Sequence, residues 1–146
     1  MVLGKLRSPS GPGQEHVDLP PVGTDGSVAT FDAFLAENVR NWGDKVVFQQ
    51  KVRKEWRRWT HVDVQRESQA LAAGLIAQGL QPGERVVMVM DNGWDWVRAY
   101  YGIVLARGIA VPIYFDLKAG EIGRMAAHAD PKFAIVGPKY LPKLDD

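Results

Sequence analysis

The most constraining feature of the sequence is an uninterrupted apolar run at residues 85–90, RVVMVM. A strand exposed on one face would alternate apolar and polar residues, so this run predicts a strand buried on both faces. Similar apolar runs occupy residues 109–114 and 133–136. Strands of this kind belong to parallel sheets that are covered by helices, and the sequence therefore predicts an α/β fold.

Segments with helical periodicity separate the three predicted strands. Residues 94–105 carry two apolar faces, so we expect a helix buried on two sides that begins with a capping-box-like NGWD at residues 92–95. Residues 118–129 predict another helix, and Pro138 can open one more. The order predicts a doubly wound βαβαβ parallel sheet with right-handed crossovers.

A β-hairpin and two helices are predicted upstream of the first buried strand. The first helix starts after Thr30 and stops near Gly43, and the second runs to about Gln78 from a capping box formed by Thr60 and Asp63. The hairpin pairs residues 46–52 with residues 56–60. Its turn lacks Asn-Gly or Asp-Gly, so the sequence leaves its register open.

Composition divides the chain into two parts. Residues 1–29 hold five glycines and four prolines with few large apolar residues, and they are expected to form a flexible leader without a phosphate loop. Residues 30–146 are expected to form one domain. The chain lacks cysteine, a signal peptide and an apolar run of the roughly 18–20 residues that span a membrane, which favours a cytoplasmic location.

The predicted hairpin carries a basic cluster at residues 51–58, with a tryptophan at residue 56 and another at residue 59. Cations interleaved with aromatic rings suit a nucleic-acid or anionic-membrane surface, as in a stand-alone binding module. The alternative is a solvated hairpin whose tryptophans pack inward, which we favour because the formal net charge is only +1. The cations are Lys51, Arg53, Lys54, Arg57 and Arg58.

Asp91 and Asp116 each follow a predicted buried strand, where parallel sheets bind ligands. They could hold magnesium or accept a phosphoryl group as in a receiver domain, for which Lys139 would supply the lysine after the last strand. A receiver also needs an acidic pair, which the sequence lacks. We therefore favour helix-start roles for both aspartates.

No residue is assigned a catalytic, cofactor-binding or metal-binding role. His16, His61 and His128 share no metal-ligand spacing and suit surface or capping positions. The sequence contains no P-loop, no dinucleotide-binding glycine motif and no Gly-x-Ser-x-Gly elbow.

Six segments, taken in order, resemble the N-terminal stretch of adenylate-forming enzymes over about residues 30–138. They are WTHVDV (59–64), ALAAGL (70–75), GLQPGERV (79–86), DNGWDW (91–96), ARGIAVPIY (106–114) and ADPKFAIV (129–136). The VPIY run looks most like the long-chain fatty acyl-CoA synthetase branch. His61 stands where the family usually has Tyr, and Phe115 where it often has Pro.

The resemblance implies a two-step ligase that uses ATP, magnesium and coenzyme A. A carboxylate would form an acyl-adenylate, and the coenzyme A thiol would then displace AMP. The family's phosphate loop, adenine pocket, ribose-binding Asp and catalytic Lys lie downstream of the matched region. The resemblance therefore implies that residues 30–146 are a partial N-terminal subdomain of an adenylating enzyme, which serves as scaffold and is inactive alone. Its partners would be the rest of the enzyme, a carboxylic acid substrate or a second copy of the chain, and no nucleic acid is expected.

Overall fold

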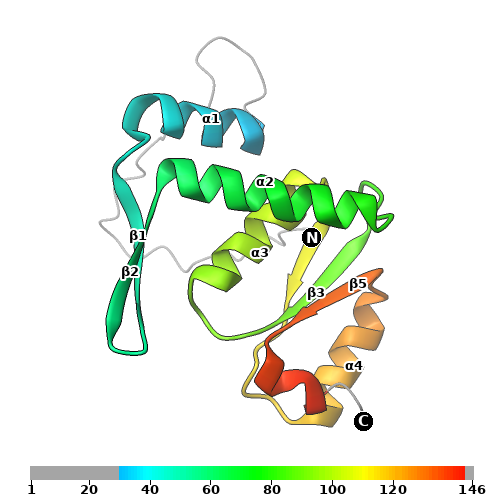
Figure 1. Ribbon diagram of the computed structural model, residues 1–146. Helices are drawn as coiled ribbons and strands as arrows, with labels where there is room; N and C mark the ends of the chain where they lie inside the picture. The colour runs from blue at the N-terminus through cyan, green and yellow to red at the C-terminus, as the bar shows by residue number, and fades with distance from the viewer. Residues whose placement is uncertain (1–29, 144–146) are drawn as a thin grey trace, which may run out of the picture. The chain divides into compact units, whose positions relative to one another are not determined.

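The computed structural model describes residues 30–143, and the leader predicted for residues 1–29 lies outside them. Every element below belongs to one compact unit that begins at Phe31. The elements are α1 (Phe31–Trp42), β1 (Val46–Val52), β2 (Glu55–Thr60), α2 (His61–Ala77), β3 (Arg85–Val89), α3 (Trp94–Leu105), β4 (Ile109–Pro112), α4 (Ala119–Ala129), β5 (Phe133–Val136) and the 3₁₀ helix η1 (Pro138–Lys143) (Figure 1).

The three buried runs form one parallel sheet in the order β4–β3–β5. Val87 of the central strand lies opposite Val111 of β4 and Ala134 of β5. Because the crossover through α3 leads to one side of β3 and the crossover through α4 leads to the other, the sheet is doubly wound. The predicted parallel α/β arrangement is confirmed.

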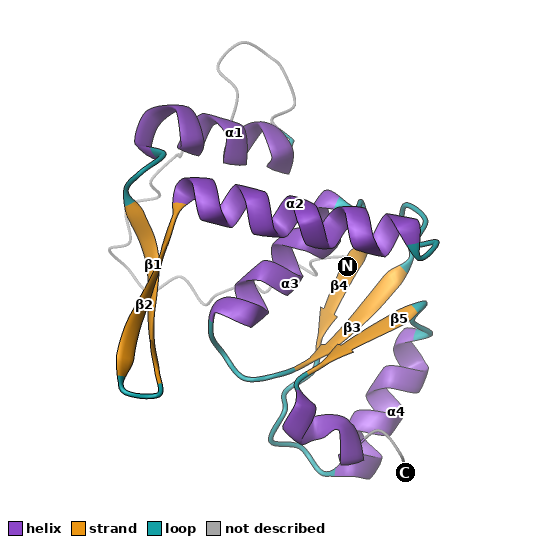
Figure 2. Cartoon of the chain, viewed as in Figure 1, coloured by secondary structure: helices purple, strands orange, loops and turns teal. Residues whose placement is uncertain are grey.

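Helices cover both faces of β3, as its uninterrupted apolar sequence requires (Figure 2). Val86 and Met88 pack in a cluster with residues of α2 and α3. Val87 and Val89, which point to the opposite face, pack in a second cluster with Ile122 of α4 and with η1. Each of these four side chains is almost fully buried, so β3 is the centre of the hydrophobic core.

The predicted hairpin is present as a separate two-stranded antiparallel sheet, β1–β2. Its two-residue turn consists of Arg53 and Lys54, and both have positive φ values of 49° and 75°. Turns of type I′ need positive φ at both positions, usually from Asn-Gly, and they fit the twist of a hairpin. The turn fixes the register that the sequence left open, with Val52 opposite Glu55.

The capping box predicted for α2 is confirmed. Thr60 Oγ1 accepts a hydrogen bond from the Asp63 amide at 3.2 Å, and Asp63 Oδ2 accepts one from the Thr60 amide at 2.9 Å. These bonds satisfy two donors that would otherwise be unpaired near the helix start. Beyond the end of α2, Gly79 takes a φ of 96°, a conformation that favours glycine.

Two local expectations are wrong. α3 does not open on a capping box of its own, because its N-cap is Gly93 and the acceptor is Gln50 Oε1 of β1, 2.9 Å from the Trp94 amide. The hairpin tryptophans do not both pack inward, since Trp56 keeps 59% of its surface exposed. A contact between β1 and α3 replaces the expected capping box, and Trp56 stays exposed because no other described element covers it.

Candidate functional site

A cavity of about 380 Å³ lies at the carboxyl edge of the sheet, where ligands bind in open α/β folds. The ends of β3 and β5 form one wall, and the first turns of α3 form another. Among the lining residues are Met90, Asp91, Gly93, Trp94, Arg98 and Gly137.

Asp91, which follows β3, is bound by two residues of η1. Its Oδ1 accepts a hydrogen bond from the Tyr140 hydroxyl at 2.6 Å and pairs with Lys139 Nζ at 2.8 Å. The sequence singled out Asp91 and Lys139 but not Tyr140, although Tyr140 is next to Lys139 and follows a strand at the same sheet edge. Asp91 therefore joins β3 to η1, and the helix-start role expected for it is taken by Gln50.

These contacts set the electrostatics of the cluster. Hydrogen bonds from Lys139 and then Tyr140 hold the pKa of Asp91 below its usual value. The bond to Asp91 raises the pKa of Lys139, and burial, followed by the same carboxylate, raises the pKa of Tyr140. The cluster is thus a carboxylate–ammonium pair with a neutral phenol at neutral pH.

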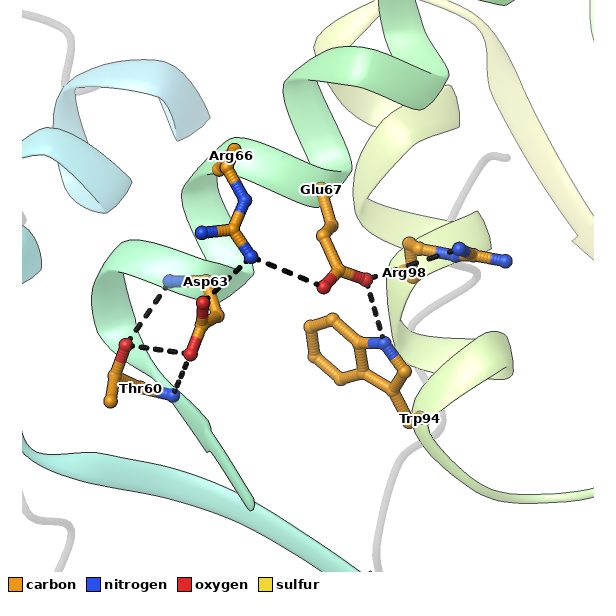
Figure 3. Close-up of polar contacts among 6 residues, drawn as sticks. All are labelled: Thr60, Asp63, Arg66, Glu67, Trp94 and Arg98. Atoms are coloured by element: carbon orange, nitrogen blue, oxygen red, sulfur yellow. Dashed lines mark hydrogen bonds and ion pairs between the residues drawn. The ribbon is translucent and has the colours of Figure 1, made fainter. Parts of the chain in front are cut away.

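A second polar network fixes the first turn of α3 against α2 (Figure 3). Glu67 Oε2 accepts a hydrogen bond from Trp94 Nε1 at 3.0 Å and lies 3.9 Å from Arg98 Nη1. Arg66 reaches both Glu67 and the capping residue Asp63 from the same helix. No local pattern points to Glu67, because Trp94 and Arg98, its partners on α3, lie 27 or more residues along the chain.

Aromatic rings pack around Trp94 and tie the hairpin to this site. Trp94 is only 7% exposed and stacks on Trp59 with ring centroids 4.8 Å apart, while Phe48 lies at 5.8 Å. A smaller cavity of about 270 Å³ adjoins these rings. Trp94 thus lines both cavities and is held by α2 on one side and the hairpin on another.

The remaining candidate residues do not join the site. Asp116 is exposed beyond β4, and α4 starts after Lys118, whose amide bonds to Glu121 Oε2. His61 begins α2 beside the Trp42 ring, His128 is exposed in the last turn of α4, and His16 lies outside the described residues.

The described part of the chain contains no group of three His, Cys, Asp or Glu side chains that could hold a metal ion. The acidic cluster that a receiver domain would need is therefore lacking there. No helix between residues 30 and 143 is both long and apolar enough to cross a membrane.

The doubly wound parallel sheet places the chain in the α/β class, whose ligands bind at the carboxyl edge of the sheet. The family model for AMP-binding enzymes matches residues 35–146, and the chain belongs to this family. The resemblance to adenylate-forming enzymes seen in the sequence is confirmed. Nothing in the comparisons supports a nucleic-acid-binding module.

Curated relatives are similar over most of this chain. The 4-hydroxybutyrate–CoA ligase 2 of Metallosphaera sedula is 28% identical over 135 residues, covering 91% of this chain and 23% of the relative. The long-chain-fatty-acid–CoA ligase FadD15 of Mycobacterium bovis is 27% identical, covering 73% of this chain and 18% of the relative. The chain therefore spans less than a quarter of the length of these two relatives.

Solved structures share the fold. The N-terminal domain of FACL13 from Mycobacterium tuberculosis has a TM-score of 0.74 at 22% identity, covering 81% of this chain and 30% of that structure. The anthranilate CoA ligase AuaEII, solved with anthranoyl-AMP, has a TM-score of 0.72 at 25% identity, covering 88% and 23%. The predicted fold class is confirmed by these neighbours.

Proposed function

We propose that this chain forms the N-terminal segment of an ATP-dependent acid–CoA ligase whose substrate is a fatty acid. The family match over residues 35–146 carries the proposal. Relatives named as CoA ligases support it, and several of them are long-chain-fatty-acid–CoA ligases. In such a reaction a carboxylate displaces pyrophosphate from ATP, and the coenzyme A thiol then displaces AMP from the acyl-adenylate.

Residues 30–143 suit a scaffolding role in this reaction rather than a catalytic one. Magnesium bound to ATP prefers carboxylate and water oxygens, and the described residues bring no such group of carboxylates together. Asp91, the carboxylate at the end of the central strand, is already bound by Lys139 and Tyr140. We therefore assign no catalytic residue and no magnesium site to this segment.

The edges of the sheet support association with another polypeptide segment. Within the described residues, β4 and β5 each pair with β3 alone, so the outer edge of each strand has free backbone donors and acceptors. The rest of a ligase, or a second copy of this chain, could pair with them. We expect light scattering to show self-association of the isolated chain that increases with concentration, and a monomer at all concentrations would contradict this.

Pyrophosphate exchange tests the scaffolding role. The 146-residue chain, incubated with ATP, magnesium, labelled pyrophosphate and a fatty acid, should show no exchange into ATP. Exchange above a no-acid control would show that adenylation is complete within this chain.

A chimera tests the family role. Residues 31–143 would replace the matching segment of a long-chain-fatty-acid–CoA ligase, and the same ligase lacking that segment is the control. We expect acyl-CoA formation by the chimera and none by the shortened ligase. A chimera that folds, as judged by circular dichroism, but forms no acyl-CoA from short or long fatty acids would contradict the proposal.

A further inference from the structure

The hairpin presents one face that combines cations with an exposed tryptophan. The register places Lys51 opposite Trp56 and Gln49 opposite Arg58. Since cross-strand partners share a face and successive residues alternate, Lys51, Trp56 and Arg58 lie on the same face of the hairpin. All three side chains are exposed.

The turn extends this cationic face, and the single acidic residue of the hairpin lies on the other side. Arg53 and Lys54 form the exposed tip next to Trp56. Glu55 pairs with Val52 on the opposite face. The cations of this face are Lys51, Arg53, Lys54 and Arg58. Within residues 30–143 none of them has an ion-pair partner, so no described residue neutralises their charge. We call Lys51, Arg53, Lys54, Trp56 and Arg58 the hairpin face.

The opposite side of the hairpin anchors it to the fold. Phe48 and Trp59 occupy that side and pack against Trp94 at the start of α3. Gln50, on the same side, bonds to the Trp94 amide. Because the opposite side of the hairpin is packed on α3, the hairpin face points away from α3.

We propose that the hairpin face is a docking surface for an anionic lipid bilayer. Lysine and arginine are attracted to anionic headgroups, and tryptophan prefers the boundary between headgroups and acyl chains. The formal net charge of the whole chain is only +1, so this attraction is local to the hairpin. The inference goes beyond the ligase proposal and does not depend on it.

The arrangement of the tryptophans favours a bilayer over nucleic acid. Proteins that bind single strands stack successive bases on several aromatic side chains. Here only Trp56 is available, because Trp59 is already stacked on Trp94. One aromatic ring surrounded by cations suits the plane of a headgroup layer.

Vesicle sedimentation tests the proposal with the full 146-residue chain. We expect binding to phosphatidylcholine vesicles that contain roughly a third phosphatidylserine, weaker binding at high salt, and little binding to phosphatidylcholine alone. Since each cation near an anionic surface contributes about a fivefold factor, K51Q together with R58Q should lower the partition coefficient about 25-fold.

Matched variants separate the contribution of the hairpin face to vesicle binding from that of the overall charge. R124Q together with K132Q removes the same charge from exposed positions outside the hairpin and should change the partition coefficient little. R57Q and R58Q alter neighbouring residues on opposite faces, so R58Q should weaken binding more. Brominated lipids should quench wild-type tryptophan emission more than that of W56F.

Three results would overturn the proposal. One is equal or absent binding to the two kinds of vesicle. Another is an equal loss from the hairpin variants and from R124Q with K132Q. The third is salt-sensitive binding to single-stranded RNA, lost in K51Q with R58Q, without vesicle binding, which would assign the face to nucleic acid instead. Circular dichroism checks that each variant is folded, as expected for substitutions at exposed side chains.

Discussion

The hydroxyl of Tyr140 donates a hydrogen bond to Asp91 Oδ1 across 2.6 Å and thereby joins η1 to the end of β3. Lys139 adds an ion pair to the same oxygen. The tyrosine ring itself packs beneath the sheet with Val87, Val89 and Ile122. Tyr140 thus holds η1 in place through a polar contact at the sheet edge and an apolar contact in the core.

The pH dependence of stability should report the Asp91 contact. The pKa of Asp91 is lowered from 3.8 in the folded state, so the carboxylate adds stability above that value and loses it as the pH falls through the folded pKa. Urea unfolding should therefore show wild type more stable than D91N near neutral pH, with the difference shrinking below pH 3.8. Comparing the two proteins cancels the titration of Asp63, whose pKa is also lowered.

Y140F provides the matched control, because it keeps the ring and removes only the hydroxyl. It should lower the melting temperature less than Y140A and should move the pKa of Asp91 upward, toward its ordinary value, in an NMR titration. A difference between wild type and D91N that stays constant with pH would contradict the assigned contact.

The cap of α3 should show strong coupling between Gly93 and Gln50. A Cβ on Gly93 would lie 2.9 Å from both Oε1 and Nε2 of Gln50, so G93A should displace the amide from the Trp94 N–H. We expect a loss of about 0.5–2 kcal/mol in the free energy of unfolding, the usual cost of a lost N-cap.

A double-mutant cycle isolates this effect. Q50A alone should cost a similar amount, and G93A should cost little more in the Q50A background because the crowded amide is gone. Additive losses in urea unfolding would show that the two residues act independently.

The order of elements could be predicted because it rests on short-range patterns. Four successive residues of β3, Val86 to Val89, are apolar, and burial on both faces follows from the alternation of side chains along a strand. The two residues of the capping box, Thr60 and Asp63, are only three positions apart. Patterns of this range can be read without knowing the tertiary structure.

The details of the site depend on contacts between residues far apart in sequence. Gln50 lies 44 residues from Trp94, and Asp91 lies 49 residues from Tyr140. No local rule selects such partners, because they are set by how the hairpin and η1 pack on the core. The exposure of Trp56 has the same origin, since only the other face of the hairpin meets α3.

The capping box of α2 should contribute measurably to stability. T60A removes the acceptor for the Asp63 amide and one donor to its carboxylate, and it should cost about 1 kcal/mol in urea unfolding. T60S retains the hydroxyl and should cost less. Equal losses for the two variants would indicate that the methyl group, not the hydrogen bonds, stabilises the helix start.

Two helix glycines should respond in opposite directions to alanine. Gly102 of α3 faces α2, and a Cβ there would lie 2.7 Å from Leu71 Cδ2 and 2.9 Å from Leu71 Cβ. Because the two helices pack closely at this point, G102A should force them apart or move Leu71, at a cost of about 1–3 kcal/mol.

Gly74, inside α2, is the control. A Cβ at Gly74 would meet no atom within 4 Å, so G74A should stabilise the protein by about 0.5–1 kcal/mol through the higher helix propensity of alanine. L71A should partly rescue G102A, because it removes the closest atom but leaves the Leu71 Cβ contact. Thermal unfolding of wild type, G74A, G102A and L71A with G102A measures these changes in stability. A G102A variant as stable as G74A would show that α2 and α3 pack less closely than described.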